Sequence, residues 1–158
     1  MGLTLMAQVI PQRGGYRPCE PGTAHRDISE VPLKTQGEIE AAICEGIIRF
    51  EEEYMGRGPT DIRAHLIDDV LLVRLQGVLT AAEQHLVKSL PAAKGRDLLK
   101  QVRTHLLETA RSLIEAMIQD ITGIKVLSMH HDVSTVTGEE VVLLTLAEPP
   151  DYRQPKKR

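Results

Sequence analysis

The chain has 158 residues, of which 42% are hydrophobic and 26% charged, and its formal net charge is −3. This length suits one globular domain, and the absence of Trp together with a single Phe predicts an aliphatic core. No stretch reaches the roughly 20 apolar residues of a membrane-spanning helix, so we expect no direct membrane insertion.

Charge is distributed unevenly along the chain. Residues 1–34 carry 4 basic and 3 acidic side chains, residues 149–158 carry 4 and 1, and the middle carries 11 and 18. An acidic middle lacks the concentrated basic face that binds a phosphate backbone, so we expect no nucleic-acid partner. Cys19 and Cys44 have no Cys-x-x-Cys spacing and predict reduced thiols in a cytoplasmic protein.

Proline marks the expected domain boundaries. Seven of the nine prolines lie outside residues 35–148. We therefore predict a flexible N-terminal arm (1–34), a single domain (35–148) and a basic, Pro-rich tail (149–158).

The domain is expected to open with a helix that begins at a capping box, Thr35-Gln-Gly-Glu38. Apolar residues then recur at steps of three and four and predict one buried stripe, which consists of Ile39, Ile43, Ile47, Phe50 and Tyr54. Gly56 is expected to end this helix, and Pro59 prevents its continuation.

Two hairpins are predicted. Residues 61–67 alternate in polarity, and an Asp68-Asp69 turn connects them to a second apolar strand over residues 70–78. The second hairpin comprises strands at 124–133 and 141–147 around a Thr137-Gly138 turn.

Between the hairpins, a second capping box (Thr80-Ala-Ala-Glu83) predicts a short helix that Pro91 and Gly95 interrupt. A long helix over residues 97–122 should follow, with Gly123 as its C-cap. Its predicted apolar stripe is broad enough to cover a sheet and contact a partner, and it consists of Leu98, Val102, Leu106, Ala110, Leu113, Met117 and Ile121, widened by Leu99, Ile114 and Ile118.

The predicted fold class is therefore α+β. The element order is helix, hairpin, helix, hairpin, and it favours a four-stranded antiparallel sheet with helices on one face. An open sheet and a broad apolar helix leave surface to cover, so we also expect a homodimer.

The best candidate ligand site is an anion site built from arginines. The turn Gly56-Arg57-Gly58-Pro59 could present backbone N–H groups and Arg57 to a small anion, or it could be a helix stop with a solvated arginine. Arg63, His65 and Arg74 lie in the first hairpin and could contribute to the same site, if the strand register places them on one face.

Catalytic and metal-binding motifs find little support. His130-His131-Asp132 lies near the end of a predicted strand, where adjacent side chains point to opposite faces and cannot easily bind one ion. The chain has no Gly-x-Ser-x-Gly elbow and no phosphate-binding glycine loop. We expect no catalytic residue, no metal and no cofactor.

Two charged segments have alternative interpretations. Glu51-Glu52-Glu53 with Asp68-Asp69 is either a solvated surface or an acidic docking surface. The terminal Pro-Lys-Lys-Arg is either a disordered tail or a weak contact to an anionic membrane.

Three segments closely resemble the small bacterial MpsC family. They are KTQGEIEAAI, FEEEYMGRGPTDIRAHLIDDVLLVRLQGVLTAAE and ITGIKVLSMHHDVSTVTGEEVVLLTL, and the resemblance covers about residues 34–147. The pieces YMGRGP and GVLTxAE are quite specific. The resemblance implies a component of a sodium-translocating, membrane-potential-generating system, whose operon companions belong to a bicarbonate or CO2 uptake assembly. It brings no catalytic residues with it.

The leading hypothesis is therefore a non-catalytic accessory or regulatory protein of such a transport system. It would be cytoplasmic, or peripheral at the inner face of the membrane, and would contact subunits of a membrane transport complex. The rival hypothesis is a small-anion sensor that uses Arg57, Arg63, Arg74 and His65. A third, an enzyme that uses His131 and Asp132 as an acid–base pair, has the least support.

Overall fold

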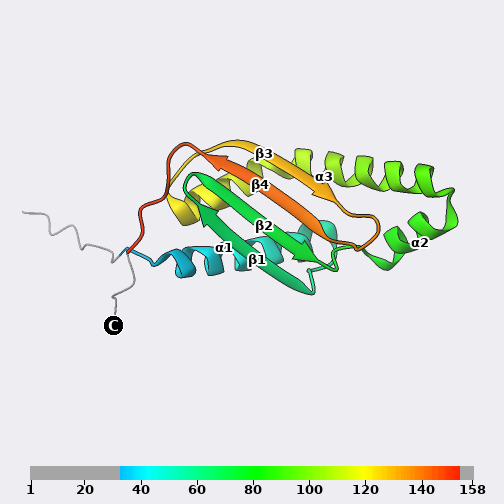
Figure 1. Ribbon diagram of the computed structural model, residues 1–158, viewed down its shortest axis with the longest axis horizontal. Coiled ribbons are helices and arrows are strands. Elements are labelled where there is room, and N and C mark those ends of the chain that lie inside the picture. The colour runs from blue at the N-terminus through cyan, green and yellow to red at the C-terminus, as the bar shows by residue number, and fades with distance from the viewer. Residues whose placement is uncertain (1–32, 154–158) are drawn as a thin grey trace, which may run out of the picture. The chain divides into compact units, whose positions relative to one another are not determined.

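The computed structural model describes residues 33–153, which form one layer of helices and one β-sheet (Figure 1). Nearly all of the predicted N-terminal arm (1–34) and the second half of the predicted tail (149–158) lie outside these residues. In chain order the elements are α1 (Gln36–Phe50), the π-helical turn η1 (Glu51–Met55), β1 (Asp61–Ile67), β2 (Val70–Gln76), α2 (Ala81–Ser89), α3 (Ala92–Thr122), β3 (Val126–Val133) and β4 (Glu140–Leu146).

The four strands form one antiparallel sheet in the order β1-β2-β4-β3. Both hairpins pair internally, and β2 pairs with β4 to join them. In Figure 1, α1 and α3 lie behind the sheet, and both contact strands as well as each other. The predicted α+β class with a four-stranded antiparallel sheet is confirmed.

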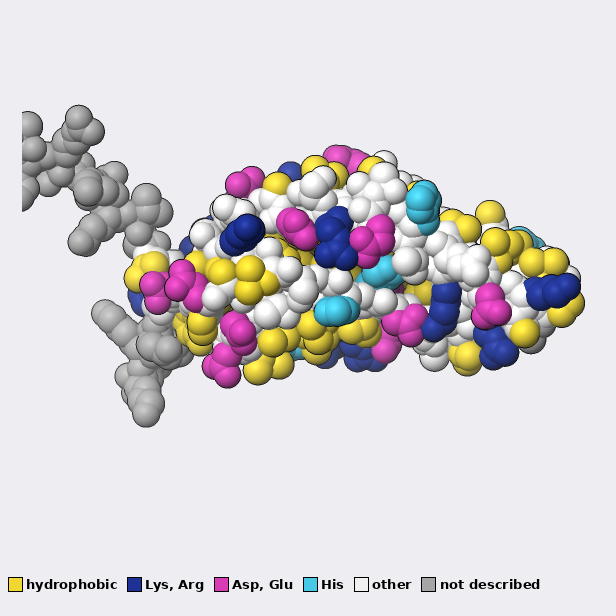
Figure 2. All heavy atoms as spheres, turned by 90° about the horizontal axis from the view of Figure 1, so that it is seen from above, with side chains coloured by type: hydrophobic (Ala, Val, Ile, Leu, Met, Phe, Trp, Pro, Cys, Tyr) yellow, Lys and Arg dark blue, Asp and Glu magenta, His cyan; other side chains and the backbone are white. Residues whose placement is uncertain are grey.

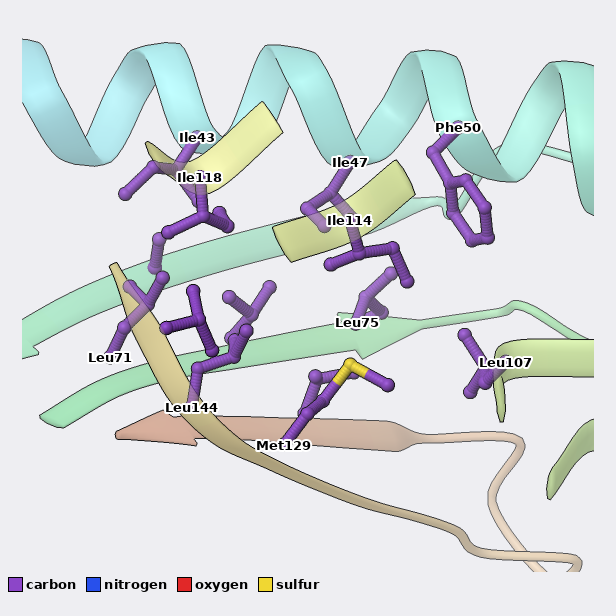
Figure 3. Close-up of a cluster of buried hydrophobic side chains, with 14 of the residues drawn as sticks. Ile43, Ile47, Phe50, Leu71, Leu75, Leu107, Ile114, Ile118, Met129 and Leu144 are labelled. Atoms are coloured by element: carbon purple, nitrogen blue, oxygen red, sulfur yellow. The ribbon is translucent and has the colours of Figure 1, made fainter. Parts of the chain in front are cut away.

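The capping box that opens α1 is present as predicted. The Thr35 hydroxyl accepts a hydrogen bond from the Glu38 backbone N–H at 3.3 Å, and the Glu38 carboxylate accepts one from the Thr35 N–H at 2.7 Å. Ile43, Ile47 and Phe50 then point from α1 toward the strands and α3, as Figure 3 shows. The 3.6-residue period thus places one face of α1 on the sheet.

The end of this helix differs from the prediction. The last turn, η1, is a π-helix, which ends at Gly56 in the left-handed region with φ 80°. A π-turn holds more residues than an α-turn and so rotates the side chains that follow it. As a result Glu51 is buried, whereas Tyr54, predicted in the apolar stripe, is 41% exposed and stacks on Phe50.

The boundary between the two middle helices also differs. Pro91 separates α2 from α3 as expected, but Gly95 lies inside α3 and does not interrupt it. A Cβ on Gly95 would meet the Leu86 carbonyl oxygen at 3.2 Å and the Val87 Cα at 3.3 Å. Because Gly95 has no side chain, the backbones of α2 and α3 can approach each other closely at this point.

The buried face of α3 is rotated from the predicted stripe. Leu98, Val102 and Leu113 were predicted in this stripe, yet they are 41%, 43% and 56% exposed, whereas the residues predicted only to widen it are buried. The prediction was wrong here because α3 has apolar residues around more than half its circumference, and only packing selects which face is covered. The residues that are buried are Leu99, Arg103, Leu107, Ala110, Ile114 and Ile118.

The sheet has one covered face and one open face. Residues of alternating parity along each strand are buried under α1 and α3, including Leu71, Leu75, Met129 and Leu144 in Figure 3. We call the other side the open face. It consists of Arg63, His65 and Ile67 from β1, Val70, Leu72 and Arg74 from β2, Val141, Leu143 and Thr145 from β4, and Ser128, His130 and Asp132 from β3.

The first and last residues of the described range, 33–153, lie close together. Pro150 is buried and Tyr152 packs against the core. The Arg153 N–H donates to the Lys34 carbonyl oxygen at 2.9 Å, so the two ends lie side by side.

Candidate functional site

Three of the four residues predicted for an anion site share the open face. Arg63 lies directly opposite Arg74 in the β1–β2 pair, and His65 follows two residues later on the same side. The strand register therefore places Arg63, His65 and Arg74 on one face, a question that the sequence alone left open.

Both arginines already have carboxylate partners. Arg63 Nε lies 3.5 Å from an Asp61 carboxylate oxygen, and Arg74 Nε donates to Glu139 at 2.8 Å. The Glu139 partner raises the pKa of the Arg74 guanidinium. Two like charges opposite each other would repel, and these carboxylates offset that repulsion.

Arg57 lies in the connection after η1. It is exposed, and its backbone N–H donates to the Glu51 carbonyl oxygen at 3.2 Å. Gly56 provides the left-handed conformation that ends the helix, so the turn has a structural role whatever Arg57 binds.

The His130-His131-Asp132 segment separates as β-geometry requires. His130 and Asp132 face outward, and Asp132 binds the Lys100 ammonium at 2.7 Å. His131 faces inward, and its side chain is 7% exposed. His131 and Asp132 therefore cannot act on one group.

The interior contains a cluster of ionic side chains that the sequence analysis did not predict. Arg103 of α3 is its centre, and the Arg103 side chain is 1% exposed. It binds Glu140 of β4 at 2.5 Å, Glu83 of α2 at 3.3 Å and Glu51 of η1 at 3.4 Å. We call these four residues, together with His131, the buried ionic cluster.

Each member of the buried ionic cluster lies in a different helix or strand. Arg103 lies one turn from Leu99 and from Leu107 on the buried face of α3, and the π-turn brings Glu51 inward. Glu83 has two roles, since one of its oxygens caps α2 at Thr80 while the other accepts from Arg103. The cluster thus connects α2, α3 and η1 to the sheet.

Two signals in the sequence point to this cluster. Arg103 interrupts a Leu99–Leu107 run at spacing four, which predicts an arginine on an apolar face. Glu140 begins the alternation that continues in Val142 and Leu144, which predicts an inward carboxylate. Glu51 gave no such signal, because it lies in an acidic run whose burial depends on the π-turn.

One arginine faces three carboxylates, and the excess negative charge affects protonation. Burial, followed by repulsion from Glu140, raises the pKa of Glu51 to about 7, against the opposing effect of Arg103. Burial alone would lower the pKa of Arg103, but Glu140, Glu51 and Glu83 outweigh it and raise that pKa. The carboxyl group of Glu51 therefore keeps its proton to a higher pH than an exposed glutamate does.

Some polar atoms of the cluster have no hydrogen-bond partner. These are Arg103 Nε, His131 Nδ1 and Glu140 Oε1, and the last two lie 3.9 Å apart. Buried polar atoms without partners are unusual and mark places where charge or hydration can change. Within residues 33–153, no three His, Cys, Asp or Glu side chains converge as a metal site would require.

Cys44 shows no sign of an activated thiol. It lies on α1 beside β1, where burial raises the pKa of its thiol. A raised pKa keeps the thiol protonated at neutral pH, which disfavours nucleophilic reactions.

The solvent-exposed surface of α3 carries a second feature, which we call the α3 stripe. It consists of Leu98, Val102, Leu106 and Leu113, all exposed or half-exposed. Leu113 lines a pocket of about 140 Å³ between α1 and α3. Gly46 also lines this pocket, and a Cβ there would overlap Met117 Sδ at 2.4 Å.

Comparisons with known proteins identify the family to which the chain is similar. The family described as Na+-translocating membrane potential-generating system (MpsC) matches residues 35–148. The uncharacterized protein YbcI of Bacillus subtilis (strain 168) is 36% identical over 113 residues, which is 72% of this chain and 89% of YbcI. No solved structure matches the chain. The resemblance seen in the sequence is confirmed, and the chain belongs to the MpsC family.

Proposed function

We propose that this protein is a non-catalytic accessory component of a sodium-translocating, membrane-potential-generating system and acts by binding a membrane subunit of that system. The description of its family supports the link to membrane potential. No helix in residues 33–153 has the length and hydrophobicity to cross a bilayer, so the proposed contact with the membrane runs through a partner.

The observation that carries this proposal is the α3 stripe. It runs along a helix of 31 residues, which is about 46 Å long, and α3 extends past the end of the sheet (Figure 1). Exposed leucine and valine at spacing four along one helix are the arrangement that recognises an apolar helix of a partner.

The pocket beside Leu113 adds a point of specificity. It is lined by Gly46, Phe50, Leu113 and Met117, with Arg49 and Glu53 at its polar side. Binding energy in protein interfaces concentrates where an apolar side chain enters such a pocket. We expect the partner to insert one aliphatic or aromatic residue there.

The charged surface favours a protein partner over nucleic acid. On the face drawn in Figure 2, Lys and Arg side chains lie beside Asp and Glu, and neither sign forms a continuous patch. Mixed charge is typical of the polar rim of a protein interface, whereas nucleic-acid binding requires one basic surface.

The test is co-purification at native abundance. We expect tagged protein to recover membrane subunits from solubilised membranes, and Leu113→Glu to reduce this recovery at least tenfold. Ser112→Glu is the matched control, because it adds the same charge at an exposed neighbouring position of α3. Recovery of no membrane subunit with the unmodified protein would overturn the proposal.

We extend the proposal to inorganic carbon and propose that the system to which this protein contributes takes up bicarbonate. Deletion of the gene should then lower bicarbonate uptake, and reintroduction of the unmodified gene should restore it. The Leu113→Glu variant should fail to restore it, while Ser112→Glu should succeed.

A small-anion sensor is the second candidate, and the shared face of Arg63, Arg74 and His65 favours it. An anion there would compete with Asp61 and Glu139. Thermal shift with bicarbonate, phosphate and nucleotides tests this function. Saturable stabilisation that Arg74→Ala or Arg57→Ala abolishes would support sensing, and no shift with any of these ligands would exclude them.

A further inference from the structure

The open face has an apolar centre that no described element covers. Val70, Leu72, Val141 and Leu143 lie in the two central strands and are only half-buried. At one corner, Ile67 is 58% exposed. A contiguous apolar area in the middle of a sheet, with polar residues around it, is typical of an association surface.

The two edges of the sheet are less available for association than its face. On β1, the Leu66 N–H donates to Glu40 and the Leu66 carbonyl oxygen accepts from Gln36, at 2.9 and 3.0 Å. The Ala64 backbone also interacts with the thiol of Cys44 on α1. Side chains of α1 therefore occupy groups that an added strand would need.

A side chain of α3 also occupies a backbone group at the β3 edge. Arg111 of α3 donates to the Met129 carbonyl oxygen at 3.5 Å. A register shift between Val126 and Ser128 also breaks the regular ladder at one end. Extension of the sheet by another strand is thus obstructed on both sides, which leaves face-to-face packing.

The register makes the open face complementary to itself. One cross-sheet row reads His65, Leu72, Leu143, His130 from β1 to β3. This row has the same character in both directions, with leucine at its centre and histidine at its ends. A second copy turned by a two-fold axis would place leucine on leucine.

The neighbouring row supplies charge complementarity. It reads Arg63, Arg74, Val141, Asp132, so its β1 end is basic and its β3 end is acidic. A two-fold axis parallel to the strands, between β2 and β4, reverses this row in the second copy. Arg63 then faces Asp132 of the second copy, and the same contact occurs twice.

We propose that the open face is the interface of a homodimer, in which two sheets pack face to face about a two-fold axis parallel to their strands. Sheets that pack in this way keep their strand directions within about 30°, which this axis permits. The α3 stripe of each copy remains free on the other side of the molecule. The dimer therefore presents two copies of the proposed partner-binding site.

Light scattering and sedimentation of the purified full-length chain test this proposal without any partner. We expect a dimer in the micromolar range, and Leu72→Glu or Leu143→Glu should yield a monomer with unchanged helical and sheet circular dichroism. Leu113→Glu, which lies on α3, is the matched control and should stay dimeric. A monomeric unmodified protein, or a dimer unaffected by both sheet variants, would overturn the proposal.

A charge exchange tests the axis itself. Arg63→Asp and Asp132→Arg should each weaken dimerisation several-fold, and the double variant should recover most of the loss. Asp132 also binds Lys100, so Lys100→Gln measures the effect of losing that pair alone. If the double variant is weaker than either single one, the sheets do not pack about this axis. Because these measurements use only the purified chain, their failure would leave the proposed membrane partner untouched.

Discussion

Arg103 and Glu140 form an ion pair in the interior, with 2.5 Å between Nη2 and Oε2 and each side chain only 1% exposed. A buried pair loses much of its hydration, and it persists only where further hydrogen bonds and charges compensate. Here Glu83 and Glu51 supply the additional contacts to Arg103. The pair joins α3 to β4 and lies beside the π-turn.

Removal of one member of this pair should strongly lower the stability of the fold. We expect Arg103→Met to lower the free energy of unfolding by about 3–5 kcal/mol, because it leaves buried carboxylates without a cation. The double variant Arg103→Met/Glu140→Leu should lose much less than the sum of the single variants. Urea unfolding at pH 6 measures all three.

The exposed pair Arg74–Glu139 is the control for this cycle, since its coupling should be only about 0.2–1 kcal/mol. Equal coupling energies for the two pairs would contradict the importance assigned to burial.

Glu51 should make stability depend on pH. Its pKa is about 7 in the folded protein and 4.5 without the fold, so the folded state binds the proton more tightly. This contribution is fully present below pH 4.5 and is lost as pH rises through 7, by about 3 kcal/mol at most. Glu51→Gln should remove this slope relative to the unmodified protein.

Glu52→Gln is the matched control for this experiment, because Glu52 is the exposed neighbour in the same turn. We expect its stability to follow the unmodified protein from pH 5 to pH 8. If Glu51→Gln shows the same pH slope as Glu52→Gln, then Glu51 is not the group that titrates.

Adjacent leucines on α3 should respond very differently to truncation. Leu99 is fully buried, so Leu99→Ala should cost about 2–5 kcal/mol through lost burial and a cavity. Leu98 is 41% exposed, and Leu98→Ala should change stability by less than about 1 kcal/mol. Thermal unfolding compares them directly, and the reverse order would place the other face of α3 against the sheet.

Two glycines should respond oppositely to alanine. Gly77 has φ 67°, and a Cβ there would lie 2.5 Å from Thr60 Oγ1, so Gly77→Ala should destabilise by about 1–3 kcal/mol. Gly37 has no atom within 4 Å of its would-be Cβ and lies in α1, so Gly37→Ala should stabilise by up to about 1 kcal/mol. Chemical denaturation of both variants checks the sign, and destabilisation by Gly37→Ala would contradict it.

Local signals predicted most of the elements. The Thr35 and Thr80 capping boxes, the alternation in residues 61–67 and the glycine at 123 each depend on interactions within a few residues. Such interactions are readable in one sequence because both partners lie close together along the chain. The predicted fold class followed from the order of these elements.

The candidate sites were predicted less well. The sequence singled out Arg63 and Arg74 but could not say that they share a face, because strand register is a long-range property. It interpreted Glu51 as part of a charged surface, although Glu51 is 2% exposed. It did not identify Arg103, whose partners are separated from it by 20 to 52 residues.

The sequence by itself determined the family, the α+β class and the order of helices and strands, since these depend on local patterns of apolar, capping and turn residues. Only the tertiary structure decided which face of α3 is buried and that a π-turn brings Glu51 to Arg103. The physical reason is that burial is a competition among all surfaces of the chain. A helix that is apolar over more than half its circumference satisfies the same sequence pattern in several rotations, and packing against the sheet selects one.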